Sequence, residues 1–175
     1  MSKVTEPSSP KTAIVVMGVA GSGKSTVAEG LAERLGWPMI ESDDLHSAEN
    51  KAKMSAGTPL TDDDRMPWLS AVRDWIDQTP GHSVVTCSAL RRSYRDLLRT
   101  ANGRVRFVHL TGSRAVLGAR IGARTGHFMP PSMLISQLET LEPLDADEDG
   151  VVVDIDASPD DIVDAALRRL GLAAS

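Results

Sequence analysis

The chain has 175 residues, of which 41% are hydrophobic and 25% charged, as is ordinary for one soluble globular domain. Its net charge of -5 argues against nucleic acid or an anionic membrane surface as a partner, because both favour a basic protein. No apolar run approaches the roughly 20 residues of a membrane span, and the single cysteine, Cys87, excludes an internal disulfide framework and is typical of a cytoplasmic protein.

The predicted elements alternate between strands and helices. Polar residues 1–12 are expected to form a flexible tail before one domain at 13–172. Strands are predicted at Ala13–Met17, Pro38–Glu41, Ser83–Cys87, Val105–Leu110 and Val151–Ile155. Helices are predicted at Lys24–Leu35, Ala48–Met54, Pro67–Gln78, Ser93–Ala101, Arg114–Arg124, Pro131–Leu138 and Asp160–Leu170. This order predicts an α/β fold, with a parallel sheet covered by helices on both faces.

A complete G-x-x-x-x-G-K-[ST] motif stands between the first strand and the first helix, which is the context a phosphate-binding loop requires. Its glycines let backbone N–H groups wrap a polyphosphate, and the helix N-terminus adds partial positive charge. We expect Lys24 to reach the β- and γ-phosphates of ATP and Ser25 to ligate Mg²⁺. The predicted ATP-binding residues here are Gly18, Ala20, Gly21, Ser22, Gly23, Lys24, Ser25 and Thr26.

Carboxylates follow the second predicted strand, and ligands of such sheets bind beyond the carboxyl ends of the strands. If strand geometry continues, Glu41 and Asp43 share a face. We assign Asp43 to the acceptor hydroxyl, as the group that orients it and takes its proton, and Glu41 to Mg²⁺ through water. Asp44 is expected to cap the next helix instead. His46 is either a hydrogen-bonding partner of a polyol or a bystander at a helix start.

Two further charged groups allow both a structural and a functional interpretation. Asp62, Asp63 and Asp64 precede a helix that is expected to begin at Pro67, where acids complement the helix dipole, although one of the three could serve binding. Arg91 and Arg92 fall near a helix start, where cations are disfavoured. They are therefore candidates for binding a substrate carboxylate, the alternative being a solvated basic face.

The remaining histidines and the cysteine are expected to be structural. His82 lies at a strand edge and His109 within a strand, and Cys87 ends a packed strand with no context that would favour a thiolate.

Arg120 and Arg124 are one helical turn apart and precede a segment interrupted by glycine and proline. This pattern predicts a lid at about 120–140 that closes over ATP and brings arginine to the transferred phosphoryl group. A surface arginine pair is the alternative. From topology, the adenine contacts are expected in the loop 156–159.

No predicted strand ends in a Walker-B aspartate, which weakens the interpretation as a motor, a GTPase or a nucleotide-binding switch. A kinase for another small acceptor, such as shikimate, adenylyl sulfate or a nucleoside monophosphate, remains the nearest alternative. Only 3% of the residues are aromatic, which argues against a base pocket for a nucleotide acceptor.

Several segments together resemble the gluconate kinases (gluconokinases), which are small P-loop kinases of nucleoside-monophosphate-kinase type. The phosphate loop is common to many nucleotide-binding families, but the D-D-D-R-x-P-W-L run together with C-S-A-L and G-H-F is specific to the gluconate kinases. The segments that carry the resemblance are residues 17–25, 43–46, 59–69, 87–92, 94–96, 126–129 and 136–143. The similarity extends from about Ile14 to Leu170.

The resemblance implies a three-layer P-loop kinase sandwich with a five-stranded parallel sheet and a mobile lid. It implies Mg²⁺- and ATP-dependent phosphorylation of D-gluconate on its 6-hydroxyl, giving 6-phosphogluconate and ADP for the pentose phosphate or Entner–Doudoroff routes. A homodimer is one possible assembly. The substrate contacts implied beside Asp43 are His46, Arg65, Arg91, Arg92 and His127.

This chain departs from the family pattern at a few positions. Asp44 stands where an aromatic or other residue is common, Ser47 replaces the usual proline, and Arg91 and Arg92 replace frequent lysines. A change from lysine to arginine keeps the charge but alters its shape. These differences bear on fine substrate preference and leave the implied reaction type intact.

Overall fold

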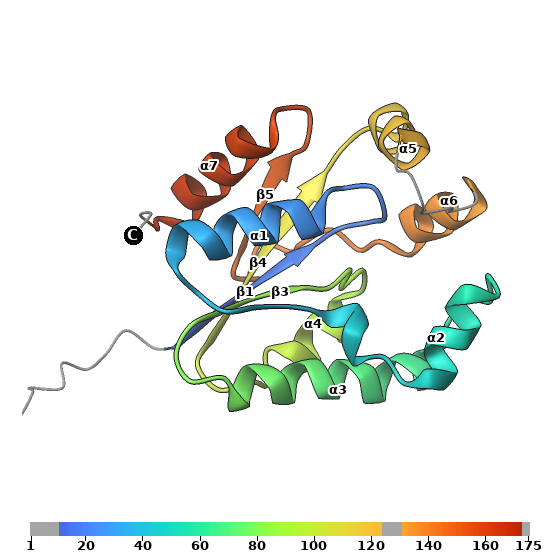
Figure 1. Cartoon of the computed structure of the whole chain (residues 1–175), viewed down its shortest axis with the longest axis horizontal. Coiled ribbons are helices and arrows are strands. Elements are labelled where there is room, and N and C mark those ends of the chain that lie inside the picture. Colours follow the sequence, from blue (N-terminus) through green and yellow to red (C-terminus); the bar gives the residue numbers. More distant parts are fainter. Residues whose placement is uncertain (1–10, 124–130, 173–175) are drawn as a thin grey trace, which may run out of the picture.

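Five parallel strands form the centre of the computed structural model, which describes residues 11–123 and 131–172 (Figure 1). The strands are β1 Thr12–Met17, β2 Met39–Glu41, β3 Ser83–Thr86, β4 Arg104–Thr111 and β5 Gly150–Asp154. Their order in the sheet is β2-β3-β1-β4-β5, and every neighbouring pair is parallel. The predicted α/β class and parallel sheet are confirmed.

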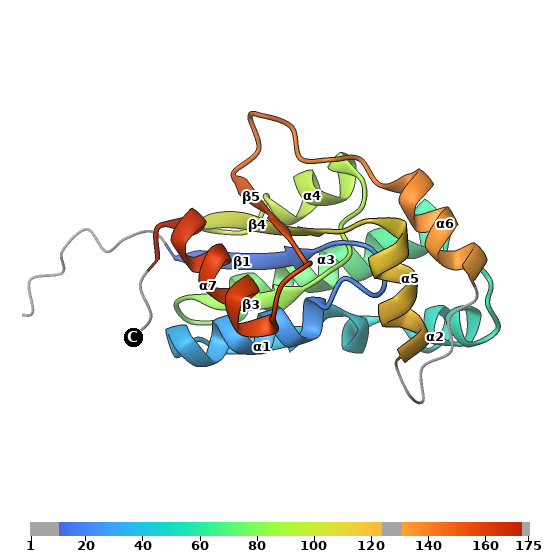
Figure 2. The same ribbon diagram turned by 90° about the horizontal axis from the view of Figure 1, so that it is seen from above.

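Two helices cover each face of the sheet. Helices α1 (Lys24–Leu35) and α7 (Pro159–Leu170) enclose one hydrophobic core, and α3 (Asp62–Gln78) and α4 (Arg92–Leu98) enclose the other. The shorter elements are the 3-10 helix η1 (Ser42–Leu45), α2 (Ala48–Ser55), α5 (Arg114–Ala123) and α6 (Pro131–Thr140). Figures 1 and 2 show α2, α5 and α6 at the carboxyl end of the sheet. None of the described helices is long and apolar enough to cross a membrane.

The packing of α1 on α7 explains a glycine in the middle of a helix. A glycine there costs about 1 kcal/mol relative to alanine, but a Cβ at Gly30 would lie only 2.7 Å from a methyl group of Val163. The close approach of the two helices therefore requires glycine. The buried face of α7 consists of Ile162, Val163, Ala166, Leu167 and Leu170, which have the spacing of an apolar stripe on a helix.

The start of α3 differs from the prediction. The helix begins at Asp62 rather than Pro67, because Thr61 caps it. The Thr61 hydroxyl accepts a hydrogen bond from the backbone N–H of Asp64, and the Asp64 carboxylate accepts one from the N–H of Thr61. Pro67 consequently lies inside the helix and not at its first position.

Two local details differ from the predictions. β1 begins at Thr12, one residue before the predicted strand, and the Thr12 N–H donates to His82 Nδ1 over 2.9 Å. Asp44 does not cap a helix, because it lies within η1 and the cap of α2 is Ser47. The Ser47 hydroxyl accepts a hydrogen bond from Asn50 N over 3.1 Å, so the residue that departs from the family pattern is the helix cap.

Candidate active site

The phosphate loop adopts a backbone that depends on glycine. Gly18, Gly21 and Gly23 have φ values of 150°, 81° and 87°. At Gly18 a Cβ would lie 2.8 Å from the hydroxyl of Ser22 and 2.9 Å from the carbonyl oxygen of Leu110, so a side chain is excluded. The motif thus forms a tight turn between β1 and α1, as predicted.

Lys24 lies across this turn. Its ammonium donates to the carbonyl oxygens of Gly18 and Val19 over 3.1 and 3.2 Å. Lys24 is also the first residue of α1, and the first N–H groups of a helix have no partner within the helix. A glycine turn, an ammonium group and a helix N-terminus at one point fit the phosphates of a nucleotide. Ser25 and Thr26 follow in the first turn of α1, where a hydroxyl is suited to Mg²⁺.

Arg120 of α5 lies between the phosphate loop and the end of β5. Its Nη1 lies 3.8 Å from the position that a Cβ on Gly23 would occupy, and its Nη2 donates to the carbonyl oxygen of Ile155. The structure therefore brings this predicted ATP-binding residue to the loop and places it beside the loop 156–159. Arg124 and His127 lie outside the described residues.

Glu41 and Asp43 lie on different elements, so the prediction that they share one face of a continuing strand is wrong. β2 stops at Glu41 and η1 starts at Ser42. The Glu41 carboxylate accepts a 2.6 Å hydrogen bond from the Thr86 hydroxyl at the end of β3. Asp43 projects into solvent from η1, with a side chain that is 82% exposed. Both residues nevertheless lie at the carboxyl end of the sheet.

Cys87 follows β3 at the carboxyl end of the sheet and is buried. Burial raises the pKa of the Cys87 thiol to about 11, and two charges act on it, the Asp43 carboxylate raising it further and the Lys24 ammonium lowering it. The high pKa agrees with a packed Cys87 and not with a nucleophile.

His46 is held in one orientation. Its ring is buried, and its Nδ1 lies 3.2 Å from Asn50 Nδ2, which also donates to the carbonyl oxygen of Asp64. Because that amide nitrogen is a donor, Nδ1 accepts, and the proton of the neutral ring lies on Nε2. Nε2 faces the Asp43 carboxylate at 3.9 Å. Burial lowers the pKa of His46, which favours this neutral donor.

Arg65 joins the same cluster. Its guanidinium donates to the Tyr94 hydroxyl over 3.1 Å and lies 5.5 Å from the centre of the Tyr94 ring, and it acts electrostatically on His46. The Tyr94 hydroxyl donates in turn to Asp62. Asn50 links His46 to the backbone of Asp64, the residue before Arg65. We call Asp43, His46 and Arg65 the acceptor cluster. Of the three predicted acids, Asp64 is structural and pairs with Lys53, whereas Asp62 borders the cluster through Tyr94.

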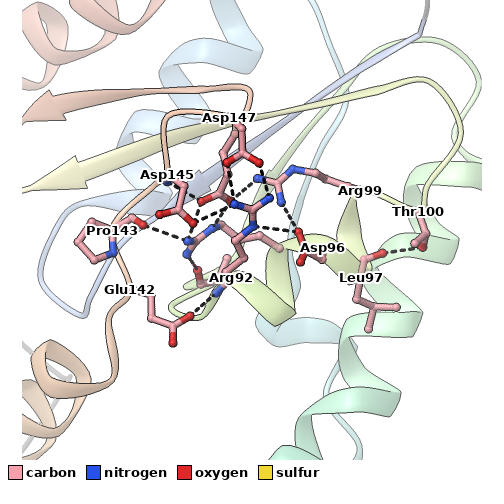
Figure 3. Close-up of polar contacts among 12 residues, drawn as sticks. Arg92, Asp96, Leu97, Arg99, Thr100, Glu142, Pro143, Asp145 and Asp147 are labelled. Carbon is pink, nitrogen blue, oxygen red and sulfur yellow. Dashed lines mark hydrogen bonds and ion pairs between the residues drawn. The ribbon is translucent and has the colours of Figure 1, made fainter.

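Arg91 and Arg92 differ in their surroundings. Arg91 is exposed at the start of α4. The Arg92 guanidinium lies 2.9 Å from Asp145, 2.7 Å from Asp147 and 3.4 Å from Asp96 (Figure 3). Two of these ion pairs hold the Arg92 guanidinium against the segment before β5. Arg92 was predicted to bind substrate, and the structure does not bring it to the acceptor cluster.

A buried ion pair holds the connection between β3 and α4, which carries Arg91. The side chains of Arg95 and Glu148 are both fully buried and lie 2.7 Å apart. Arg95 also donates to the carbonyl oxygen of Ala89 over 2.9 Å. Ala89 has a φ of 44°, a left-handed conformation that is strained for alanine. The arginine therefore stabilises an unfavourable backbone at the point where the chain leaves the sheet.

Four residues that contact the candidate site were not predicted from the sequence as site residues. Trp68, which stacks on His46, lies in a helix and looks like a core residue. Asn50 has no local signal at all. Tyr94 and Gln137 occur in the family-like runs but carry no charge that would single them out.

The strand order, the phosphate loop after β1 and the lysine across it define a P-loop protein of the small-kinase type. A family profile described as "AAA domain" matches residues 14–144. The chain is 49% identical to the gluconokinase of Gluconobacter oxydans (strain 621H) over 159 residues, 89% of each chain. It is 45% identical to the thermoresistant gluconokinase of Escherichia coli (strain K12), covering 88% of this chain and 90% of that one.

A solved structure agrees with these relatives. The crystal structure of a gluconokinase from Sinorhizobium meliloti 1021 superposes with a TM-score of 0.86 at 52% identity, and the match covers 92% of each chain. The chain belongs to the gluconokinase family, and it is a kinase.

Proposed function

We propose that this protein transfers the γ-phosphoryl group of ATP to the 6-hydroxyl of D-gluconate. The observation that carries the proposal is the place of Asp43 in the acceptor cluster, at the carboxyl end of the sheet where the phosphate loop also lies. Asp43 faces His46 Nε2 at 3.9 Å. The identity of the acceptor rests on the gluconokinase relatives.

On the nucleotide side, the phosphates would bind the glycine turn and the start of α1. The residues proposed for ATP are Gly18, Ala20, Gly21, Ser22, Gly23, Lys24, Ser25, Thr26, Arg120 and Arg124. Mg²⁺ would bind the Ser25 hydroxyl, with Glu41 acting through water. When bound, the ion offsets phosphate charge. Lys24 and Arg124 would stabilise charge on the transferring phosphoryl group.

On the acceptor side, Asp43 would orient the 6-hydroxyl and take its proton as the oxygen bonds to phosphorus and the bond to ADP breaks. His46, with Nε2–H as donor, and Arg65 would bind the polyol, and His127 would assist. We assign the gluconate carboxylate to Arg91, because Arg92 already pairs with Asp96, Asp145 and Asp147. Among the described residues no ion pair is seen at Arg91, and a guanidinium can bind a carboxylate bidentately.

We further propose that the reaction takes place in the cytoplasm. A homodimer is one possible assembly, and light scattering on the purified protein measures it directly.

The test is ADP release with Mg·ATP in the presence of D-gluconate, shikimate, glucose, AMP or no acceptor. Release that depends on gluconate supports the proposal. Release with another acceptor, or equal release without any, overturns the assignment of gluconate.

A further inference from the structure

Gln137 of α6 is hydrogen-bonded to the phosphate loop. Its Oε1 accepts the backbone N–H of Ala20 over 2.7 Å, between residues 117 positions apart. Gln137 belongs to the run 136–143, which contributes to the family resemblance but has no role in the function proposed above. This short hydrogen bond connects Gln137 directly to the predicted ATP-binding loop.

The other polar contacts of the loop's first half come mostly from its own neighbourhood. Lys24 donates to the carbonyl oxygens of Gly18 and Val19, and the N–H and hydroxyl of Ser22 donate to Val19 O over 3.2 and 2.7 Å. The N–H of Gly18 donates to Ser88 O over 3.3 Å. Within the described part of the chain, Gln137 is the side chain from a distant element that bonds this backbone.

The position of Gln137 is fixed by the packing of α6 and by the hydrogen bonds of the segment that follows it. Leu134 and Leu138 pack in the same core cluster as Val19, and Gln137, three residues after Leu134, lies on the same helix face. At the end of α6, Glu142 N donates to Leu90 O over 2.6 Å. The Glu142 carboxylate accepts from the backbone N–H of Arg92 over 2.7 Å. Figures 1 and 2 show α6 at the end of the sheet where the phosphate loop lies.

We propose that Gln137 is a positioning residue of the ATP site, which holds the first half of the phosphate loop through the N–H of Ala20. The inference rests on the proposed use of ATP and is independent of the acceptor. An amide suits this place better than a carboxylate does. Glutamate could accept the same hydrogen bond, but its charge would repel the phosphates of the nucleotide.

The experiment compares Gln137→Met, which removes the acceptor oxygen at similar length, with Gln137→Glu, which keeps it. The measurements are Mg·ADP binding by calorimetry and hydrogen exchange of the Ala20 amide by NMR. Glu139→Gln, an exposed change on the same helix, is the control.

We expect Gln137→Met to lose protection of the Ala20 amide and to bind Mg·ADP about fivefold more weakly, as for the loss of one ordinary hydrogen bond. Gln137→Glu should keep the protection but bind Mg·ADP more weakly than wild type. In turnover, the KM for ATP should rise in Gln137→Met while the KM for gluconate stays within about twofold.

Unchanged Mg·ADP binding or unchanged Ala20 protection in Gln137→Met would overturn the inference, as would an equal effect of Glu139→Gln. Wild-type protein that binds Mg·ADP but does not phosphorylate gluconate would contradict only the proposed acceptor. Wild-type protein that does not bind Mg·ADP would overturn the use of ATP and this inference with it.

Discussion

The imidazole ring of His46 stacks on the indole ring of Trp68, with centroids 4.1 Å apart and an angle of 15° between the planes. The Trp68 Nε1–H also donates to the carbonyl oxygen of Ser42 over 2.7 Å. Trp68 therefore holds the residues on either side of Asp43, namely Ser42 through its carbonyl oxygen and His46 through its ring. Asp43 lies between these two fixed points, so its backbone is positioned although its side chain is in solvent.

Asp43→Asn tests the role of the candidate base. The amide cannot take a proton, so we expect kcat to fall by about 10²–10⁴, the range typical of general base catalysis. Binding of Mg·ATP, measured by calorimetry, should stay near the wild-type value. Lost affinity for Mg·ATP would instead indicate that Asp43 serves the metal site.

Lys24→Met removes the ammonium that crosses the phosphate loop and keeps the aliphatic stem. We expect kcat to fall by at least about 10²–10³, as when one preorganised donor to the transition state is removed. Arg124→Ala should have an effect of the same order. Steady-state kinetics at saturating gluconate measure both, and a near-normal kcat in either variant would show that its assigned role is wrong.

Arg91→Ala and Arg92→Ala form a matched pair of adjacent changes. Loss of a bidentate contact to the substrate carboxylate should raise the KM for gluconate by about tenfold or more in Arg91→Ala, with thermal stability preserved. Arg92→Ala removes ion pairs with three carboxylates, so we expect it to lower the melting temperature and to leave that KM nearly unchanged. The opposite pattern would reassign the carboxylate to Arg92.

Acidification should destabilise the fold through His109. Burial, with a smaller contribution from Arg95, lowers the pKa of His109 to about 4, against an ordinary value of 6.5. Between these values the unfolded chain binds a proton that the folded chain does not, so the free energy of unfolding falls as the pH drops. The loss from this group amounts to about 3 kcal/mol.

Urea unfolding of wild type and His109→Gln at pH 7 and pH 4.5 measures this contribution as the difference between their pH slopes. We expect a flatter slope for His109→Gln, and equal slopes would refute the assignment. Glu148 is present in both proteins, so its contribution cancels in the difference between their slopes. Burial alone would raise the pKa of Glu148, but hydrogen bonds, above all from Arg95, lower it to about 2, and the stabilisation by this group is lost as the pH falls from about 4.5 to about 2.

The sequence predicted the sheet and the phosphate loop well, because both depend on local patterns. The apolar run of β1, the glycines and the stripe of α7 each carry their structure within a few residues. The start of α3 was missed because a proline at the first helical position and the capping box at Thr61 compete, and the capping box prevails.

The acceptor cluster could be predicted only in part. Asp43 and His46 follow a strand and are visible in the sequence, and Arg65 entered through the family resemblance. Their arrangement depends on Trp68, Asn50 and Tyr94, which come from three helices. Arg92 pairs with Asp145 and Asp147, which are more than 50 positions away in the sequence. A local sequence pattern cannot predict such a contact.

Phosphorus and carbon NMR of the reaction of D-gluconate with Mg·ATP and this protein identifies the acceptor oxygen directly. We expect one phosphate ester, on the oxygen of C6, formed in equal amount with ADP. An ester at another carbon, or ADP and inorganic phosphate with no ester, would contradict the proposed function.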